Sequence, residues 1–172
     1  MKKVIFILST VALVLFTQST NAQKSQNIVD IAVSVDDFST LVTALKAADL
    51  VGALQGDGPF TVFAPVNSGF AKIDANTLNS LLEPANKEKL AAILTYHVVA
   101  GKIVAADVVA ALEKGNGKAE LTTLNGGKVT AVSKDGGIFL MDANGNYSKI
   151  AKIDVMASNG VIHIIEDVVM PQ

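Results

Sequence analysis

The chain has 172 residues, a formal net charge of −2, no Cys and no Arg. A net acidic chain without Arg is a poor candidate for nucleic-acid binding or for bidentate recognition of phosphate. The absence of Cys excludes thiol catalysis, sulfur-ligated zinc and disulfides, so the apolar core has to stabilise the fold.

Residues 1–22 have the layout of a secretory signal peptide. Lys2 and Lys3 precede the apolar run "VIFILSTVALVLF", which is shorter than the roughly 20 residues of a membrane span. "TQSTNA" then places Thr20 and Ala22 at the −3 and −1 positions of a cleavage site after Ala22. The alternative is an uncleaved membrane anchor. Cleavage leaves residues 23–172 as a single domain in the periplasm or outside the cell.

The first half of the chain is predicted to be mainly helical. Phe38, Leu41, Val42 and Leu45 recur at helical spacing, with Asp36 or Asp37 as the N-cap residue. A second helix is expected to end at Gly56, and it is followed by a buried strand over 60–64 that Pro65 terminates. The later helices are expected in "NSGFAKI", "ANTLNSLLEP", "NKEKLAAILTY" after an Asn86 N-cap, and 107–112.

After Gly117 the apolar period changes to two, which is typical of strands. The segments "KAELTTL", "KVTAVS", "GIFLMD" and "YSKIAKID" are separated by the hairpin-turn sequences "NGG", "KDGG" and "ANGN". A last strand is expected over 161–169, with Pro171 at its end. Helices in the first half and strands in the second half indicate an α+β domain.

The two histidines are the main candidates for chemistry. His163 lies in an apolar strand with Ile162 and Ile164 on the opposite face, so it is expected to be buried and hydrogen-bonded. His97 lies where a helix changes into a strand, and it is either a structural residue or, with Tyr96, a contact residue. Neither has a nucleophile or a clear carboxylate partner in the sequence, so no catalytic residue, metal or cofactor is predicted.

Three segments resemble the signatures of the fasciclin domain. "GPFTVFAPVNSGFAKI" resembles the first, "ILTYHVV" resembles the central Tyr-His motif, and "DVMASNGVIHIIEDVVMP" resembles the second. Their order and spacing match over about residues 27–172. The type that the chain resembles is a single-domain, secreted bacterial fasciclin-like protein.

The resemblance implies a compact α+β fold in which helices pack on a two-sheet β wedge. The strands at 60–64 and 161–169 would be central to it. The residues of the structural motif would be Thr61, Phe63, Pro65, Phe70, Asn159, Gly160 and His163.

The resemblance also implies a non-enzymatic adhesion role. In animal members a Tyr-His motif and an Asp-Ile pair are tied to adhesion, and the corresponding residues here are Tyr96, His97, Asp154 and Val155. Val155 departs from the family's Ile, and Gly69 stands where Ala is usual. The glycine is expected to weaken a helix start by up to about 1 kcal/mol.

The leading hypothesis is a secreted or cell-surface module that binds a cell-surface or matrix protein or a polysaccharide, without catalysis. The alternative is an extracytoplasmic carrier of a small apolar ligand, because 50% of the residues are hydrophobic and the mean hydropathy is +0.43. A hydrolase or metal enzyme is the least favoured class. Weak self-association is a further expectation, because adhesive modules gain strength from multivalency.

Overall fold

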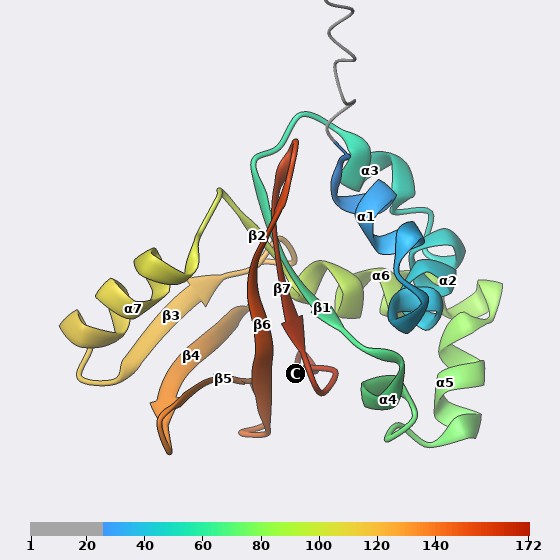
Figure 1. The fold of residues 1–172 in the computed structure, drawn as a ribbon. Coiled ribbons are helices and arrows are strands. Elements are labelled where there is room, and N and C mark those ends of the chain that lie inside the picture. Colours follow the sequence, from blue (N-terminus) through green and yellow to red (C-terminus); the bar gives the residue numbers. More distant parts are fainter. Residues whose placement is uncertain (1–25) are drawn as a thin grey trace, which may run out of the picture.

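The structure is a computed structural model that describes residues 26–172 (Figure 1). The expected signal peptide, residues 1–22, lies outside the described residues. From residue 26 onward, no helix is both long enough and apolar enough to cross a membrane.

Seven α-helices and two 3₁₀ helices are described between residues 26 and 172, and all but α7 precede the second strand. Asn27 and Asp30 form a capping box at the start of α1, and the Asp74 side chain caps α5. The helices are α1 (Ile28–Ser34), η1 (Asp36–Phe38), α2 (Ser39–Ala47), α3 (Val51–Gln55), α4 (Asn67–Phe70), α5 (Ala75–Leu82), η2 (Pro84–Asn86), α6 (Lys87–Tyr96) and α7 (Ala105–Lys114).

Seven strands in the described part of the chain form one hydrogen-bonded order, β2-β1-β7-β6-β5-β4-β3. Strands β1 and β7 are parallel, and every other pair is antiparallel. The strands are β1 (Phe60–Pro65), β2 (Val98–Ala100), β3 (Lys118–Thr122), β4 (Lys128–Lys134), β5 (Gly137–Met141), β6 (Tyr147–Ala157) and β7 (Gly160–Ile165).

The expected wedge is present, but its two parts are joined through β6. This long strand pairs with β7 on one side and with β5 on the other, and Figure 1 shows the two parts diverging from it. At the opposite edges, a single bridge joins Val99 beside β1 to Thr123 after β3. The α+β class and the central positions of β1 and β7 are confirmed.

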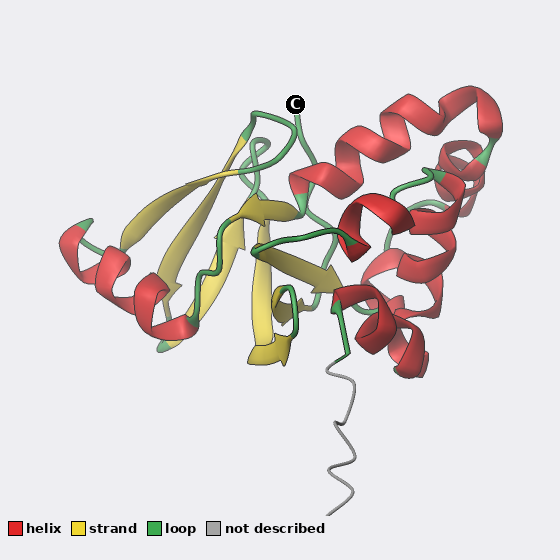
Figure 2. Ribbon diagram, turned by 90° about the horizontal axis from the view of Figure 1, so that it is seen from above, coloured by secondary structure: helices red, strands yellow, loops and turns green. Residues whose placement is uncertain are grey.

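Two apolar clusters lie on opposite faces of β1 and β7. Val62, Ala64 and Ile162 face the helices α1 to α6, whereas Phe63 and Ile165 face the interior of the wedge. Helix α7 closes the wedge with Val108 and Leu112, apart from the other helices in Figure 2. The continuous burial of β1 and β7 explains why they lack the apolar–polar alternation of a half-exposed strand.

The turn between β4 and β5 has the conformation that its sequence predicts. Between β4 and β5, Asp135 and Gly136 have φ angles of 50° and 76°, as a two-residue type I′ turn requires.

The prediction that Asp36 or Asp37 is the N-cap residue of the helix is wrong. These residues form η1, and the N-cap position of α2 is taken by Phe38, which makes no side-chain cap.

The last strand is shorter than expected, since β7 ends at Ile165 rather than continuing to residue 169. The N–H of Glu166 still donates to the carbonyl of Lys149 in β6. Further along, side chains take over: His97 accepts from the N–H of Val169, and Asp142 accepts from that of Met170. Pro171 therefore follows a tethered segment and does not terminate a strand.

Candidate functional site

His163 occupies the middle of β7, beside Phe63 of β1, and is 1% exposed. Its Nε2 lies 2.9 Å from the carbonyl oxygen of Ile103, and its Nδ1 lies 3.3 Å from the backbone nitrogen of Asp154. Because a carbonyl only accepts and a backbone N–H only donates, Nε2 carries the proton and Nδ1 accepts. The imidazole thereby connects β7 to β6 and to the loop before α7.

Asp154 has a left-handed backbone conformation, with φ of 57°. The β6–β7 register shifts on both sides of Lys152, so residues 152–156 form an irregular segment that we call the β6 bulge. The Asp154 carboxylate accepts a 2.8 Å hydrogen bond from the N–H of Ala105, the first residue of α7. A carboxylate at this position also interacts favourably with the helix dipole, so Asp154 fixes the bulge to the start of α7.

The β6 bulge presents two large apolar side chains to solvent. Ile153 is 46% exposed and Met156 is 51% exposed, although they flank the anchored Asp154. Val155 is half-buried and packs against the helical cluster. The Asp154–Val155 pair expected from the sequence is thus the anchored centre of an exposed apolar segment.

The loop between β2 and α7 is also fixed by Thr61. Its buried hydroxyl donates to the carbonyl of Gly101 at 2.7 Å and accepts from the N–H of Ile103 at 2.8 Å. Ile103 is therefore bound twice, by Thr61 through its N–H and by His163 through its carbonyl.

Tyr96 and His97 are buried, with exposures of 1% and 2%. The Tyr96 hydroxyl donates to the carbonyl of Lys128 at 2.6 Å, and burial raises the pKa of this phenol. His97 Nδ1 donates to the carbonyl of Ile93 at 2.8 Å, and Nε2 accepts from the N–H of Val169 at 3.1 Å. Burial lowers the pKa of His97 to about 4, and the Ile93 hydrogen bond opposes this only in part.

The Tyr96–His97 pair and the Asp154–Val155 pair do not form one surface by direct contact of their side chains. They are connected through Phe63, whose N–H donates to the His97 carbonyl at 2.9 Å and whose ring stacks on His163 at 5.5 Å between centroids. In this conformation, Tyr96 and His97 can influence a partner only through the backbone that they hold.

The other residues of the sequence motifs secure chain crossings. The Asn159 side chain accepts from the N–H of Ile28 and donates to the carbonyls of Leu54 and Gly56, which binds the β6–β7 turn to α1 and α3. At Gly160, a Cβ would lie 2.0 Å from the backbone oxygen of Phe60, so only glycine fits. Phe70 and Pro65 are buried.

Gly69 has a role that the sequence did not indicate. A Cβ at this position would lie 2.6 Å from the carbonyl oxygen of Glu166, on the segment that follows β7. The glycine allows α4 to approach that segment closely. Its helix-weakening effect is therefore secondary to this packing requirement.

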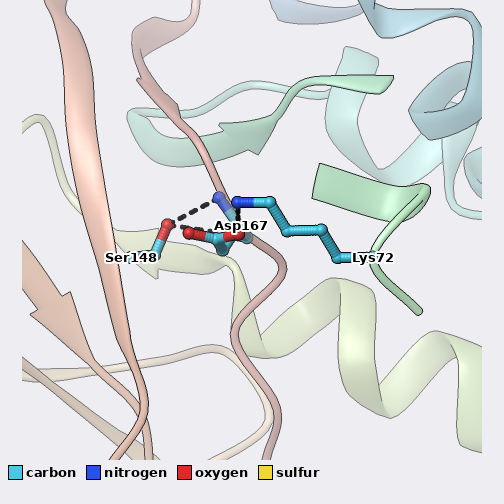
Figure 3. Close-up of polar contacts among 3 residues, drawn as sticks. All are labelled: Lys72, Ser148 and Asp167. Carbon is cyan, nitrogen blue, oxygen red and sulfur yellow. Dashed lines mark hydrogen bonds and ion pairs between the residues drawn. The ribbon is translucent and has the colours of Figure 1, made fainter. Parts of the chain in front are cut away.

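The C-terminal segment is further fixed by Ser148, which the sequence analysis did not single out. Its Oγ accepts from the N–H of Asp167 and donates to the carbonyl of the same residue, both at 2.9 Å. The Asp167 carboxylate also pairs with Lys72 after α4, as Figure 3 shows. No residue pattern distinguishes Ser148 from other strand serines, because its partner is a backbone pair 19 residues away.

Among residues 26–172 no group of three His, Cys, Asp or Glu side chains is close enough to hold a metal ion. Both histidines use both ring nitrogens on backbone groups. In the same part of the chain, the apolar cavity between the helices and β1–β7 measures about 20 Å³, which is room for about one water molecule.

Comparisons with known proteins agree with this geometry. The model of the family described as "Fasciclin domain" matches residues 36–171, so the chain belongs to the fasciclin domain family. "Protein sll1483" of Synechocystis is 49% identical over 147 residues, covering 86% of this chain and 74% of that protein. The pig "Transforming growth factor-beta-induced protein ig-h3" is 34% identical, but the match covers 84% of this chain and only 19% of that protein.

A solved structure has the same fold. It is the FAS1 domain pair of the insect cell adhesion molecule Fasciclin I, which superposes with a TM-score of 0.72 at 19% sequence identity. The match covers 83% of this chain and 50% of that one. The chain therefore corresponds to about half of the domain pair.

Proposed function

We propose that the protein is a secreted or cell-surface interaction module without catalytic activity, which binds a protein or polysaccharide of cell surfaces or matrix. The observation that carries the proposal is the β6 bulge. It exposes Ile153 and Met156 on a backbone that Asp154 and His163 hold in place. Exposed apolar side chains on a rigid support fit a contact surface, because little conformational entropy is lost on binding.

The comparison with fasciclin proteins also supports an interaction role. Fasciclin I, which shares the fold, is an insect cell adhesion molecule. Within the proposed site, Asp154 and Val155 shape the bulge, and Ile153 and Met156 make the contacts. Tyr96 and His97 support the adjoining backbone from inside. A carrier role is not part of this proposal. The interior apolar cavity of about 20 Å³ is far below the roughly 300 Å³ of a small-ligand pocket, and the larger hollow of about 560 Å³ beside α1, α2 and α3 is open to solvent.

Binding of the purified protein to its producing cells, other cells, matrix proteins and glycans tests the proposal. Single replacements Tyr96→Ala, His97→Ala and Asp154→Ala are compared with the parent, each with its own melting curve. The proposal expects binding to at least one of these surfaces and a loss in Asp154→Ala. Binding that survives all three replacements removes the site, and no binding to any surface removes the adhesion role.

A further inference from the structure

One face of strands β3 to β6 is left open by the helices. The inner face carries Ala131 and Leu140, which pack against α7. On the outer face, Val132, Phe139 and Met141 belong to neither apolar cluster. Val132 is 8% exposed, and Phe139 and Met141 are half-buried. Figure 1 shows β3, β4 and β5 on the side of the molecule away from α1 to α6.

The register of the strands places these side chains in two rows. Directly paired residues share a face of the sheet, so Lys118, Val132, Phe139 and Lys149 form one row across the four strands. The second row, by the same pairings, is Glu120, Thr130, Met141 and Tyr147. We call the surface formed by these rows, with Lys128 and Lys134 beside them, the open face.

The open face is basic in a protein of net charge −2. Its four lysines, at positions 118, 128, 134 and 149, are all exposed, and its strand residues include one carboxylate, Glu120. Glu120 pairs with Lys128 at 2.7 Å, and Asp135 lies at the rim in the β4–β5 turn. Lys118, Lys134 and Lys149 therefore make no ion pair with a carboxylate of the described chain.

Aromatic and apolar side chains lie between the lysines. Tyr147 is 44% exposed, and the Nζ of Lys134 lies 5.0 Å from the centre of its ring. The Phe139 ring lies beside Gly137, where a Cβ would be 3.3 Å from the ring. Aromatic and apolar side chains between separated cations fit an extended chain of sugar rings that carry carboxylates, with the sugar rings against the apolar centre and the carboxylates at the lysines.

We propose that the open face binds an acidic polysaccharide, such as a polymer of uronic acids. The inference rests on the proposed interaction role, since it names one partner class, but it uses a surface separate from the β6 bulge. Lysine provides a point charge without the planar bidentate geometry of Arg, which suits binding to a regularly charged polymer better than recognition of a single anionic group. Charge complementarity distinguishes this occupant from a neutral glycan.

Binding of the purified protein to alginate, with neutral dextran and single-stranded DNA as comparison polymers, tests the inference. The triple variant Lys118→Gln/Lys134→Gln/Lys149→Gln should bind alginate at least about tenfold more weakly. The control Lys46→Gln/Lys87→Gln/Lys89→Gln, which removes the same charge from the helical half, should bind like the parent. Glu120→Gln should bind more tightly, and raising NaCl from about 0.02 M to about 0.5 M should weaken binding.

Equal loss in the two triple variants, equal binding of dextran, or tighter binding of DNA than of alginate would overturn the inference. So would no alginate binding by a folded parent protein. The double variant Ile153→Ser/Met156→Ser separates the two proposals, because it should lose cell or matrix binding and keep alginate binding. Loss of alginate binding in that variant would contradict a separate face.

Discussion

The backbone N–H of Asp154 donates to Nδ1 of the buried His163 at 3.3 Å, while the carboxylate of Asp154 accepts from the start of α7. A buried strand residue thus determines the conformation of an exposed bulge on the neighbouring strand. Because the same imidazole donates to the carbonyl of Ile103, three segments depend on one side chain. The exposed Ile153 and Met156 depend on this anchor for their position.

Replacing His163 by Ala should destabilise the fold strongly. The change leaves a buried carbonyl and a buried N–H without partners and opens a cavity beside Phe63, which together cost about 2–4 kcal/mol. The melting temperature should fall by about 5–15 °C. Lys152→Ala, an exposed change on the same bulge, should shift it by less than about 2 °C. Equal melting temperatures for His163→Ala and the parent would contradict the anchoring role.

The unfolding free energies of Asp154 variants should rank according to how well each residue tolerates the left-handed backbone and accepts the hydrogen bond from Ala105. Asn tolerates the left-handed conformation and retains an acceptor for Ala105, so Asp154→Asn should cost less than about 1 kcal/mol. Ala has neither property, so Asp154→Ala should cost about 1–3 kcal/mol. Gly tolerates the left-handed backbone but lacks the acceptor, so the cost of Asp154→Gly should lie between those of Asp154→Asn and Asp154→Ala. Urea unfolding measures the order, and a result with Ala as stable as Asn would refute the account of this residue.

Stability should fall as the pH falls from about 7 to 5. The pKa of His97 is lowered from 6.5 to about 4 in the folded protein, so the unfolded chain binds more protons in this range. Integrated to pH 5, this costs about 2 kcal/mol of unfolding free energy. The comparison is made with His97→Gln, which keeps every other titrating group and whose stability should change less. Parallel pH profiles for the two proteins would contradict the prediction.

Two glycines in short helices should respond to Ala in opposite directions. At Gly69 a Cβ would meet the Glu166 carbonyl oxygen at 2.6 Å, so Gly69→Ala should destabilise by about 1–3 kcal/mol. At Gly52 in α3 nothing lies within 4 Å, so Gly52→Ala should stabilise by about 0.4–1 kcal/mol. Thermal unfolding of both variants measures the difference. A stabilising effect at Gly69 would restore the simple helix-propensity argument.

The sequence predicted the kinds of elements well, because periodicity and turn residues are local properties. The helical face of Phe38, Leu41 and Leu45 is buried, and the "KDGG" turn has the expected conformation. The end of β7 was not predictable, because Val168 and Val169 continue the apolar pattern while their backbone pairs elsewhere. Local pattern carries no information on such distant partners.

The candidate site was less predictable for the same reason. The partners of His163 and Asp154 are backbone groups of Ile103 and Ala105, which lie 60 and 49 residues away in sequence. No side-chain type marks a carbonyl or an N–H as a partner. Exposure at Ile153 and Met156 follows from the irregular register of β6, and a strict alternation does not reveal it.

The most direct test of the proposed interaction surface is cell or matrix binding by Ile153→Ser/Met156→Ser, beside the control Val109→Ser/Leu124→Ser. The control removes two apolar side chains of similar exposure, 42% and 45%, from elsewhere on the surface. With melting temperatures unchanged, the bulge variant should bind at least about tenfold more weakly than the parent, and the control should bind equally well. Parent-like binding by the bulge variant would contradict the assignment of the β6 bulge as the contact surface.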